Sequence, residues 1–213
     1  MYLSWNEKTI TDFSAENVEA MYEQGYVFTR IGKGVMHQTR SARIDLSKFE
    51  LSSENRRILK KVESLELIVH SIPYQKYEPQ IGKIAKNFYD ARQADFSANK
   101  AKELITEQSV TNHNRFLEFR TGDTHRGYCI AFETNILFHY CYPFYDFESK
   151  DFGLGMMLKA ILWAKKNAKR YFYLGSLQRP NDTYKLQFSG LEWFDGKEWQ
   201  TDSAKAKKVL IQS

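Results

Sequence analysis

The sequence predicts an α+β fold with a mixed, mainly antiparallel sheet. Several segments carry apolar residues at the 3.6-residue spacing of amphipathic helices. Three successive segments between residues 115 and 142 are rich in aromatic and β-branched residues and have the pattern of strands. A long helix pattern and one more short strand follow, and a hairpin pattern comes near the C-terminus. Helices and strands in this order are typical of the α+β class.

The N-terminal elements form a smaller region. An amphipathic helix is expected over residues 15–24, because Gly25 ends the pattern. Strands are expected at residues 26–30, 35–39 and 41–47. A helix follows through Glu63, since Ser52 or Ser53 can cap it and Glu54 suits its first turn. We expect these elements to make an N-terminal basic extension, a hairpin plus a helix, over residues 1–75.

The extension carries the densest group of basic residues in the chain. If the hairpin and the helix pack together, their cations form one surface suited to the phosphates of structured RNA. A charged helix is equally often just a solvated face, and that alternative stays open. The residues predicted to contact RNA are Arg30, His37, Arg40, Arg56, Arg57 and Lys60.

The second region is expected over residues 76–213, because Pro73 and Pro79 mark a boundary or linker. Helices are expected from Ile81 to about Phe96 and over residues 98–108. The predicted strands then lie at residues 115–120, 127–133, 135–142 and 171–175, with a hairpin between the first two. The turn at 180–183 precedes a short helix, and Asp195-Gly196 suits a two-residue hairpin.

The most informative segment of this region is residues 151–164. Gly153 and Gly155 are expected to form a turn that opens an amphipathic helix. Backbone N–H groups from Gly153 to Met156 would then be free to bind an anion or a carbonyl oxygen. The alternative is that the glycine pair is ordinary turn chemistry. The order of elements is that of a GNAT-like (acyl-CoA N-acyltransferase-type) domain, in which the donor binds beside this turn.

Composition narrows the functional classes. The net charge is +5 and the sequence pI is near 9.0, which fits a polyanionic partner. The two cysteines, Cys129 and Cys141, lie in predicted strands and outside any metal-binding spacing, so we expect buried thiols and no metal. The sequence has no apolar run of membrane-spanning length and no secretory leader pattern. A soluble cytoplasmic protein without membrane contact is therefore expected.

Three stretches carry a resemblance to a known family. The first is Gly25-Tyr-Val-Phe-Thr-Arg30 with residues 49–61; the second is Leu154-Gly155 with Tyr173-Leu-Gly175; the third is Tyr184-Lys185-Leu-Gln-Phe188. In this order they resemble the aminoacyl-tRNA–protein transferases of the arginyl/leucyl type, which look like single GNAT domains with an N-terminal extension. The resemblance covers most of the chain. It implies transfer of an amino acid from charged tRNA to the N-terminal amine of a protein or peptide, without any cofactor, in the N-degron context.

The chain departs from this family at several places. The N-terminal cysteine cluster of the family is missing, because residues 35–43 hold no cysteine. Ser176 stands where an aromatic residue usually follows Leu-Gly, and the connection to Tyr184 is a residue or two short. The helix near Tyr89 and Arg92 follows the family pattern only loosely. Substrate choice in this chain is therefore open.

The resemblance and the chemistry together give the candidate active-site residues. Acyl transfer to an amine needs a polarised carbonyl and a deprotonated nucleophile. Tyr184 and Lys185 are expected near the donor, although a lysine on a short surface helix is an equal alternative. Glu133 and His139 interrupt apolar strands and are candidates for proton removal, although either is more often structural. The predicted donor-binding residues are Gly153, Leu154, Gly155, Met156, Gly175 and Ser176.

Two other functions remain as alternatives at this point. An acyl-CoA-dependent N-acetyltransferase is less favoured, because the Phe-Gly-Leu-Gly sequence of residues 152–155 lacks the usual pyrophosphate-binding form. A non-catalytic tRNA-binding relative would keep the basic extension and lose the acyl pocket.

Three acids that precede the glycine pair are further candidates for the active site. Asp146, Glu148 and Asp151 could receive an acceptor amine.

Overall fold

A computed structural model describes residues 3–145 and 151–211 of the chain. The chain divides into two compact units. Unit 1 contains residues 1–53, 134–139 and 164–213, and unit 2 contains residues 54–133 and 140–163. Each unit therefore draws on both sides of the predicted boundary at residue 75, and the division into two domains at that residue stays a prediction.

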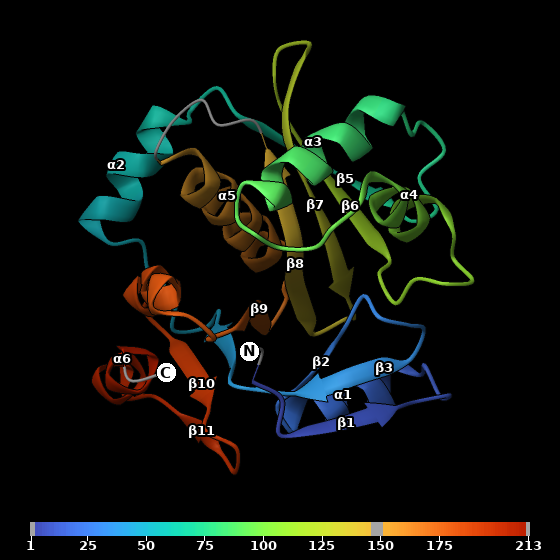
Figure 1. Ribbon diagram of the computed structural model, residues 1–213. Coiled ribbons are helices and arrows are strands. Elements are labelled where there is room, and N and C mark those ends of the chain that lie inside the picture. Colours follow the sequence, from blue (N-terminus) through green and yellow to red (C-terminus); the bar gives the residue numbers. More distant parts are fainter. Residues whose placement is uncertain (1–2, 146–150, 212–213) are drawn as a thin grey trace. The chain divides into compact units, whose positions relative to one another are not determined.

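Unit 1 contains two sheets (Figure 1). The smaller sheet has the strand order β1-β3-β2 and is antiparallel. In the larger sheet the strands β11, β10, β4 and β9 pair antiparallel in that order. Strand β9 also pairs in parallel with the start of β8, with Leu137 opposite Tyr171 and His139 opposite Tyr173. The elements of unit 1 are β1 (Asn6–Thr9), α1 (Ala15–Glu23), β2 (Tyr26–Phe28), β3 (Val35–Gln38), β4 (Ser41–Asp45), β8 (Leu137–Tyr145, shared with unit 2), β9 (Tyr171–Ser176), η1 (Pro180–Gln187), β10 (Leu191–Phe194), β11 (Trp199–Gln200) and α6 (Ser203–Ile211).

Unit 2 is a meander of strands covered by helices. Strand β5 pairs antiparallel with β6, and β6 with β7, in a register that places Phe116 opposite Ile130. Figure 1 shows α3 and α4 across one face of these strands. The elements are α2 (Ser53–Lys61), β5 (Glu66–Ser71), α3 (Pro79–Asp90), α4 (Ala98–Thr106), β6 (Arg115–Thr121), β7 (Thr124–Glu133), the rest of β8, and α5 (Phe152–Lys166), whose last turn belongs to unit 1.

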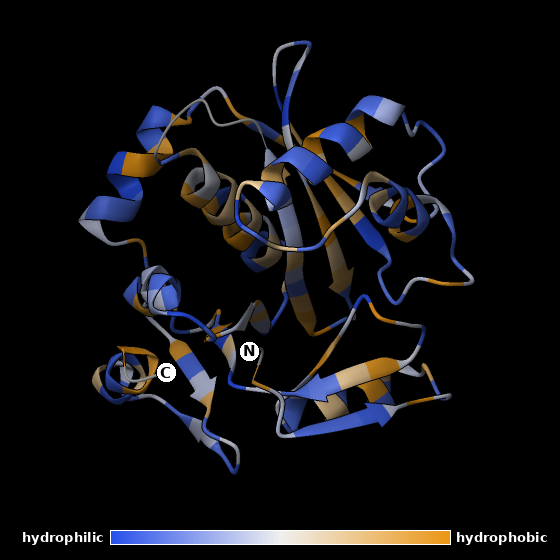
Figure 2. Cartoon of the chain, in the orientation of Figure 1, coloured by the Kyte–Doolittle hydropathy of each residue, from blue (hydrophilic) through white to orange (hydrophobic). Residues whose placement is uncertain are grey.

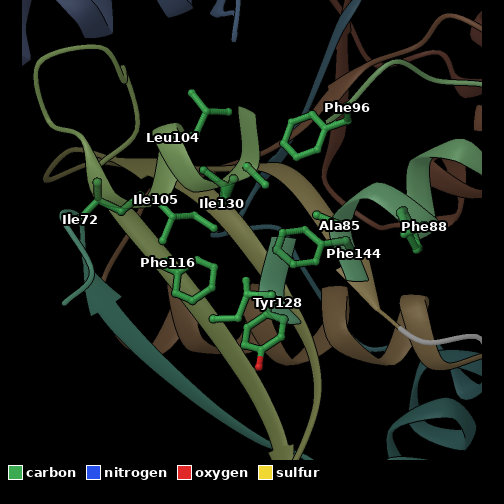
Figure 3. Close-up of a cluster of buried hydrophobic side chains, with 12 residues drawn as sticks. Ile72, Ala85, Phe88, Phe96, Leu104, Ile105, Phe116, Tyr128, Ile130 and Phe144 are labelled. Carbon is green, nitrogen blue, oxygen red and sulfur yellow. The ribbon is translucent and has the colours of Figure 1, made fainter. Parts of the chain in front are cut away.

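The core of unit 2 explains why α3 and α4 form where they do. Apolar side chains of both helices meet aromatic side chains of the strands in one buried cluster (Figure 3). Ala85 of α3, Ile105 of α4 and Phe116 of β6 are fully buried in it. Burying such side chains removes apolar surface from water at about 25 cal/mol per Å², which fixes the helices on the sheet. The cluster comprises Ile72, Ile81, Ala85, Phe88, Phe96, Ala101, Leu104, Ile105, Phe116, Tyr128, Ile130 and Phe144.

The α+β class and the mixed, mainly antiparallel sheet are confirmed by these pairings, while four local expectations are wrong. The helix expected to reach Phe96 ends at Asp90. Pro79 is not part of a linker, because it is the first residue of α3, where its missing N–H costs nothing. The loop between β10 and β11 contains residues 195–198 instead of two residues, and the Asp195 N–H donates to the Glu198 carbonyl. Gly153 and Gly155 lie inside α5 and do not precede it.

Some elements carry too little sequence pattern to be found. The sequence did not indicate β1, β5 or α6. β1 is exposed along its whole length, so it has no apolar alternation.

None of the helices among the described residues has the length and apolar character needed to span a membrane. Within residues 3–145 and 151–211, no three His, Cys, Asp or Glu side chains gather as a metal ion would require.

Candidate active site

In unit 1, Lys185 lies at the carboxyl end of β9. The short helix η1 carries it back toward the strand, and its Nζ donates to the Ser176 carbonyl at 2.7 Å. The side chain is buried, with 7% of its surface exposed, so the alternative of a lysine on a surface helix is wrong. Its neighbour Tyr184 is 44% exposed, with its ring centroid 5.8 Å from the Lys185 Nζ. Lys185 thus contacts Ser176 and lies beside Tyr184, and the roles of these residues at a donor site stay predictions.

Asp182 holds this lysine in position. Its Oδ1 lies 3.0 Å from the Lys185 Nζ, and its Oδ2 accepts hydrogen bonds from the Gln178 and Arg179 N–H groups at 2.8 and 2.9 Å. Burial acts to raise the pKa of Asp182, but Lys185 and the two N–H groups outweigh burial and hold the pKa below its ordinary value. Asp182 therefore stays ionised and places a negative charge 3.0 Å from the Lys185 Nζ beside the end of β9.

His139 lies next to the same strand end. Gly175 has φ +79°, a left-handed conformation that favours glycine, and a Cβ added there would lie 3.9 Å from the His139 Nε2. The His139 Nδ1 forms a 2.9 Å hydrogen bond with the Tyr22 hydroxyl, whose direction depends on the tautomer. His139 is only 3% exposed. The predicted base candidate and the predicted donor-binding Gly175 are therefore neighbours in unit 1.

Glu133, the other base candidate, lies at the end of β7 in unit 2. Its Oε1 accepts from the Arg115 Nε at 2.6 Å. Its backbone N–H donates to the Asn114 Oδ1 at 2.9 Å, and the Asn114 Nδ2 donates to the Glu133 carbonyl at 2.8 Å. These contacts fasten β7 to the residue before β6, which gives Glu133 a structural role in unit 2. Its predicted catalytic role stays a prediction.

The first turn of α5 differs from the expected open glycine turn. The Gly155 N–H donates to the Asp151 carbonyl at 2.9 Å, as in a regular helix, so it is not free for a ligand. Helix geometry leaves the N–H groups of Phe152, Gly153 and Leu154 without an acceptor within α5. Met156 is fully buried, which makes it a core residue. Among the predicted donor-binding residues of this segment, Gly153 and Leu154 are therefore better placed to contact a donor than Gly155 and Met156.

Close packing also accounts for the two glycines. A Cβ added at Gly153 would lie 2.3 Å from the Tyr145 hydroxyl oxygen, and one at Gly155 would lie 2.8 Å from methyl groups of Val62. Both distances are shorter than real Cβ contacts. The glycines thus let Tyr145 and Val62, the residue after α2, approach the first turn of α5, which is a reason for their presence independent of any ligand.

The predicted RNA-binding residues differ strongly in exposure. On α2, Arg56, Arg57 and Lys60 are exposed, and Figure 2 shows this helix as mostly hydrophilic. Arg57 is paired with Glu54 at 2.5 Å and with Asp151 at 3.3 Å. Asp151 also binds Lys61 at 2.6 Å, and this hydrogen bond lowers the pKa of Asp151. The acids therefore neutralise part of the predicted basic face, while Asp146 and Glu148 lie outside the described residues.

In unit 1 the basic residues of the hairpin are mostly engaged or buried. Arg30 is half-buried, and the half-buried His37 has its Nε2 2.8 Å from the Glu7 Oε2. Arg40 is 9% exposed and its Nη1 donates to the Leu177 carbonyl at 3.4 Å, while burial lowers its pKa. Arg40 thus offers little surface to a phosphate. The aromatic residues Tyr26 and Phe28 of the neighbouring strand β2 are buried as well.

Two positioning residues near Lys185 escaped sequence reasoning. Gln178 follows β9 and donates through its Nε2 to the Thr39 hydroxyl at 2.7 Å and to the Leu3 carbonyl at 3.1 Å. Asp182 was considered only as part of a turn. The available signal was its place three residues before Lys185, the spacing at which helical side chains meet.

Comparison with known proteins supports the resemblance. No family model matches the chain. The chain is 29% identical over 170 residues to an aspartate/glutamate leucyltransferase of Ruegeria pomeroyi, an alignment that covers 75% of this chain and 61% of that protein. The chain thus spans less than two thirds of the length of this relative. The resemblance to transferases of the arginyl/leucyl type, first drawn from short motifs, is confirmed by this match.

Solved structures resemble the chain in fold. The structure of L-PGS from Bacillus licheniformis superimposes with a TM-score of 0.50 and 12% identity, covering 75% of this chain and 49% of that one. A GCN5-related glucosamine N-acetyltransferase region of a fungal multi-domain GH3 β-N-acetylglucosaminidase gives a TM-score of 0.49 and 8% identity, covering 87% and 22%. The L-PGS structure shares the α+β fold of this chain, and the GNAT-like assignment drawn from the order of elements stays a prediction.

Proposed function

We propose that the protein is an aminoacyl-tRNA-dependent transferase that moves an amino acid of the arginine or leucine type to the N-terminal amine of a protein or peptide. The observation that carries the proposal is the 170-residue match to an aspartate/glutamate leucyltransferase. The name of that relative favours leucine as the donated residue and an acidic acceptor. Cytoplasmic location and the absence of a cofactor belong to the same proposal.

The reaction would be an aminolysis. The acceptor amine attacks the ester carbonyl of the charged tRNA, an amide bond forms, the ester C–O bond breaks, and the ribose hydroxyl leaves with a proton. Lys185 suits this chemistry because it is a fixed cation at the end of β9, held by Asp182 at 3.0 Å. A positioned cation can stabilise the oxyanion of the tetrahedral intermediate or the nearby phosphate of the tRNA end. We assign Gly175 and Ser176 to the same donor site, with Tyr184 beside it.

Binding of the tRNA would fall to the exposed cations. Arg56 and Lys60 are exposed on α2, and the net charge of +5 favours a polyanion. We expect a smaller contribution to tRNA binding from Arg30, His37 and Arg57, because each is half-buried or paired with a carboxylate. Arg40 would act indirectly, by supporting the strand end near Leu177.

The test is a transfer assay. The pure protein is incubated with tRNAs charged with labelled arginine, leucine or phenylalanine and with peptides that begin with Asp, Glu, Lys or Arg. Label in the peptide names the donor and the acceptor. Transfer should disappear in Lys185→Ala and persist in Lys166→Ala, which removes an exposed lysine. Lys185→Arg should retain part of the activity if charge is what matters.

Two results would contradict the proposal, and a third would correct the role of Lys185. No transfer from any pair, with tRNA still bound, would indicate a non-catalytic RNA-binding protein. Thermal stabilisation by acetyl-CoA, with acetylation of an amine, would indicate an N-acetyltransferase. Full activity in a folded Lys185→Ala variant would remove Lys185 from the mechanism and leave the transferase function standing.

A further inference from the structure

Unit 2 contains a pocket that the proposed function does not use. Its volume is about 360 Å³, and residues of β5, β6, β7, the loop before α3 and the start of α3 line it. The residues that define its chemistry are His70, Tyr74, Glu78, Glu118, His125 and Tyr128. The pocket lies entirely within unit 2, so it can be described without reference to Lys185.

The innermost charged group of the pocket is the Glu118 carboxylate. Glu118 is 5% exposed, although it is an acid in the middle of β6. Its Oε2 lies 2.7 Å from the His70 Nε2 and its Oε1 lies 3.0 Å from the His125 Nδ1. A carboxylate accepts about four hydrogen bonds, so two acceptor positions remain on these oxygens. An acid this deeply buried needs further donors or a positive partner to offset its lost hydration.

Aromatic rings form the walls around this carboxylate. Tyr74 lies 4.8 Å from the His70 ring and 4.9 Å from the Phe116 ring, and Tyr128 lies 6.1 Å from the His125 ring. Burial raises the pKa of Tyr74, and the negative charges of Glu118 and Glu78 raise it further. The pocket therefore combines a buried carboxylate with ring faces, an environment that suits organic cations.

The positively charged residues of the pocket do not oppose the binding of a cation. Arg120 pairs with Glu66, with its Nε 3.3 Å from the Glu66 Oε2. His70 and His125 already point a ring nitrogen at Glu118. Lys76 is exposed and lies at the rim, as does Glu78 at the first position before α3. An anion would have to approach the buried carboxylate, whereas a cation would complete its set of donors.

We propose that this pocket binds a primary ammonium group, with the ammonium hydrogen-bonded to Glu118, the carbon atoms beside it against Tyr74 and Tyr128, and Glu78 at the entrance. A primary ammonium supplies three donors, which suits the two open positions on Glu118 and one more acceptor. The assignment is independent of the transferase proposal. The ammonium belongs either to a free amine or to the N-terminus of a peptide, and the two sources have the same chemistry at the site.

The experiment measures binding by chemical-shift titration and calorimetry with three probes: leucinamide, the peptide Asp-Ala-Ala-Phe, and its N-acetylated form. We expect saturable binding of at least one free amine, with shifts confined to unit 2 residues near Glu118, and no binding of the acetylated peptide. Peptide binding much tighter than leucinamide binding would identify a peptide N-terminus as the ligand, and the reverse would identify a free amine.

Variants assign the binding to the pocket. Glu118→Gln should weaken binding about tenfold or more, because a charge-assisted hydrogen bond is lost. Glu78→Gln, at the exposed rim, should weaken it less and tests the site even if Glu118→Gln fails to fold. Glu107→Gln removes an exposed carboxylate outside the pocket and should bind normally. Equal binding of the acetylated peptide, no saturable binding of either free amine, or unchanged affinity in both pocket variants would overturn the proposal.

Discussion

Arg43 of unit 1 and the basic residues of α2 in unit 2 have the same charge but opposite surroundings. Arg43 is 3% exposed and contacts carboxylates, a tyrosine hydroxyl and aromatic rings, whereas Arg56 and Lys60 face solvent. The Arg43 Nε lies 2.8 Å from the Glu192 Oε2, and the guanidinium carbon of Arg43 lies 3.9 Å from the ring centroids of both Tyr171 and Trp199. The difference shows that basic residues indicate a nucleic-acid surface only when buried structural arginines such as Arg43 are left out of the count.

The largest effect should come from removing the buried cation. Arg43→Met leaves the Glu192 carboxylate, which is 13% exposed, without its main partner. Burial acts to lower the pKa of Arg43, but Glu23, Tyr173 and Glu192 keep it above its ordinary value. We expect a loss of about 3–5 kcal/mol in the free energy of unfolding, as for other broken buried pairs.

Urea denaturation checks this prediction. Arg56→Met is the matched control, because the same substitution on the exposed face of α2 should leave the denaturation midpoint unchanged. Equal effects of the two substitutions would mean that burial does not separate the two sets of cations.

The next effect concerns RNA binding. The double variant Arg56→Ala/Lys60→Ala should weaken tRNA binding and reduce the slope of log K against log salt by about one to two, with each lost phosphate contact accounting for nearly one unit. Binding measured at several salt concentrations gives this slope. An unchanged slope would show that α2 does not contact the phosphates and that its cations are only a solvated face.

The buried Lys185 gives a pH-dependent prediction. The pKa of its partner Asp182 is held below the ordinary value of 3.8, so ionised Asp182 stabilises the fold above that pH. The stabilisation is lost as the pH falls through the lowered pKa of the folded state. Asp182→Asn should therefore be less stable near neutral pH and should lose less stability than the natural chain between pH 5 and 2.

Thermal melts across this pH range test the prediction. Asp123→Asn, at the exposed tip of the hairpin between β6 and β7, is the control that should leave the pH profile unchanged. Parallel profiles for the natural chain and Asp182→Asn would show that Asp182 does not stabilise the fold through its charge.

The smallest effect should follow from Glu54→Gln. Arg57 and Glu54 form an exposed ion pair three residues apart on α2, and such pairs contribute little to stability. We expect an unchanged denaturation midpoint and a modest increase in tRNA affinity, because Arg57 loses a competing carboxylate. A decrease in affinity would mean that Glu54 orients Arg57 toward the RNA.

Sequence reasoning succeeded where residue pattern determines structure. The apolar spacing of α1, α3 and α4 and the alternation of β6 and β7 gave these elements to within a few residues, except at the end of α3. Lys185 of the Tyr184-Lys185 motif contacts the end of β9, and its role at a donor site stays a prediction. These features depend on local periodicity or on neighbours in the chain, which a single sequence contains.

The remaining features depend on contacts between distant segments. The glycine pair in α5 was taken for a turn, because the sequence cannot show that Tyr145 and Val62 pack against those positions. The burial of Arg40 and Arg43 arises from the pairing of β4 with β9, more than a hundred residues later. The same holds for Glu118, whose partners His70 and His125 come from two other strands.

The division of the chain between the two units has a consequence for synthesis on the ribosome. Unit 2 draws on residues 54–133 and 140–163, whereas unit 1 joins residues 1–53 to residues 134–139 and 164–213. Strand β4 must wait for β9 and β10, since it pairs with both. Contacts between such distant residues form slowly, because a long loop must close first. We expect a nascent chain that has emerged from the ribosome as far as residue 165 to protect unit 2 from proteolysis while its first fifty residues are still cleaved.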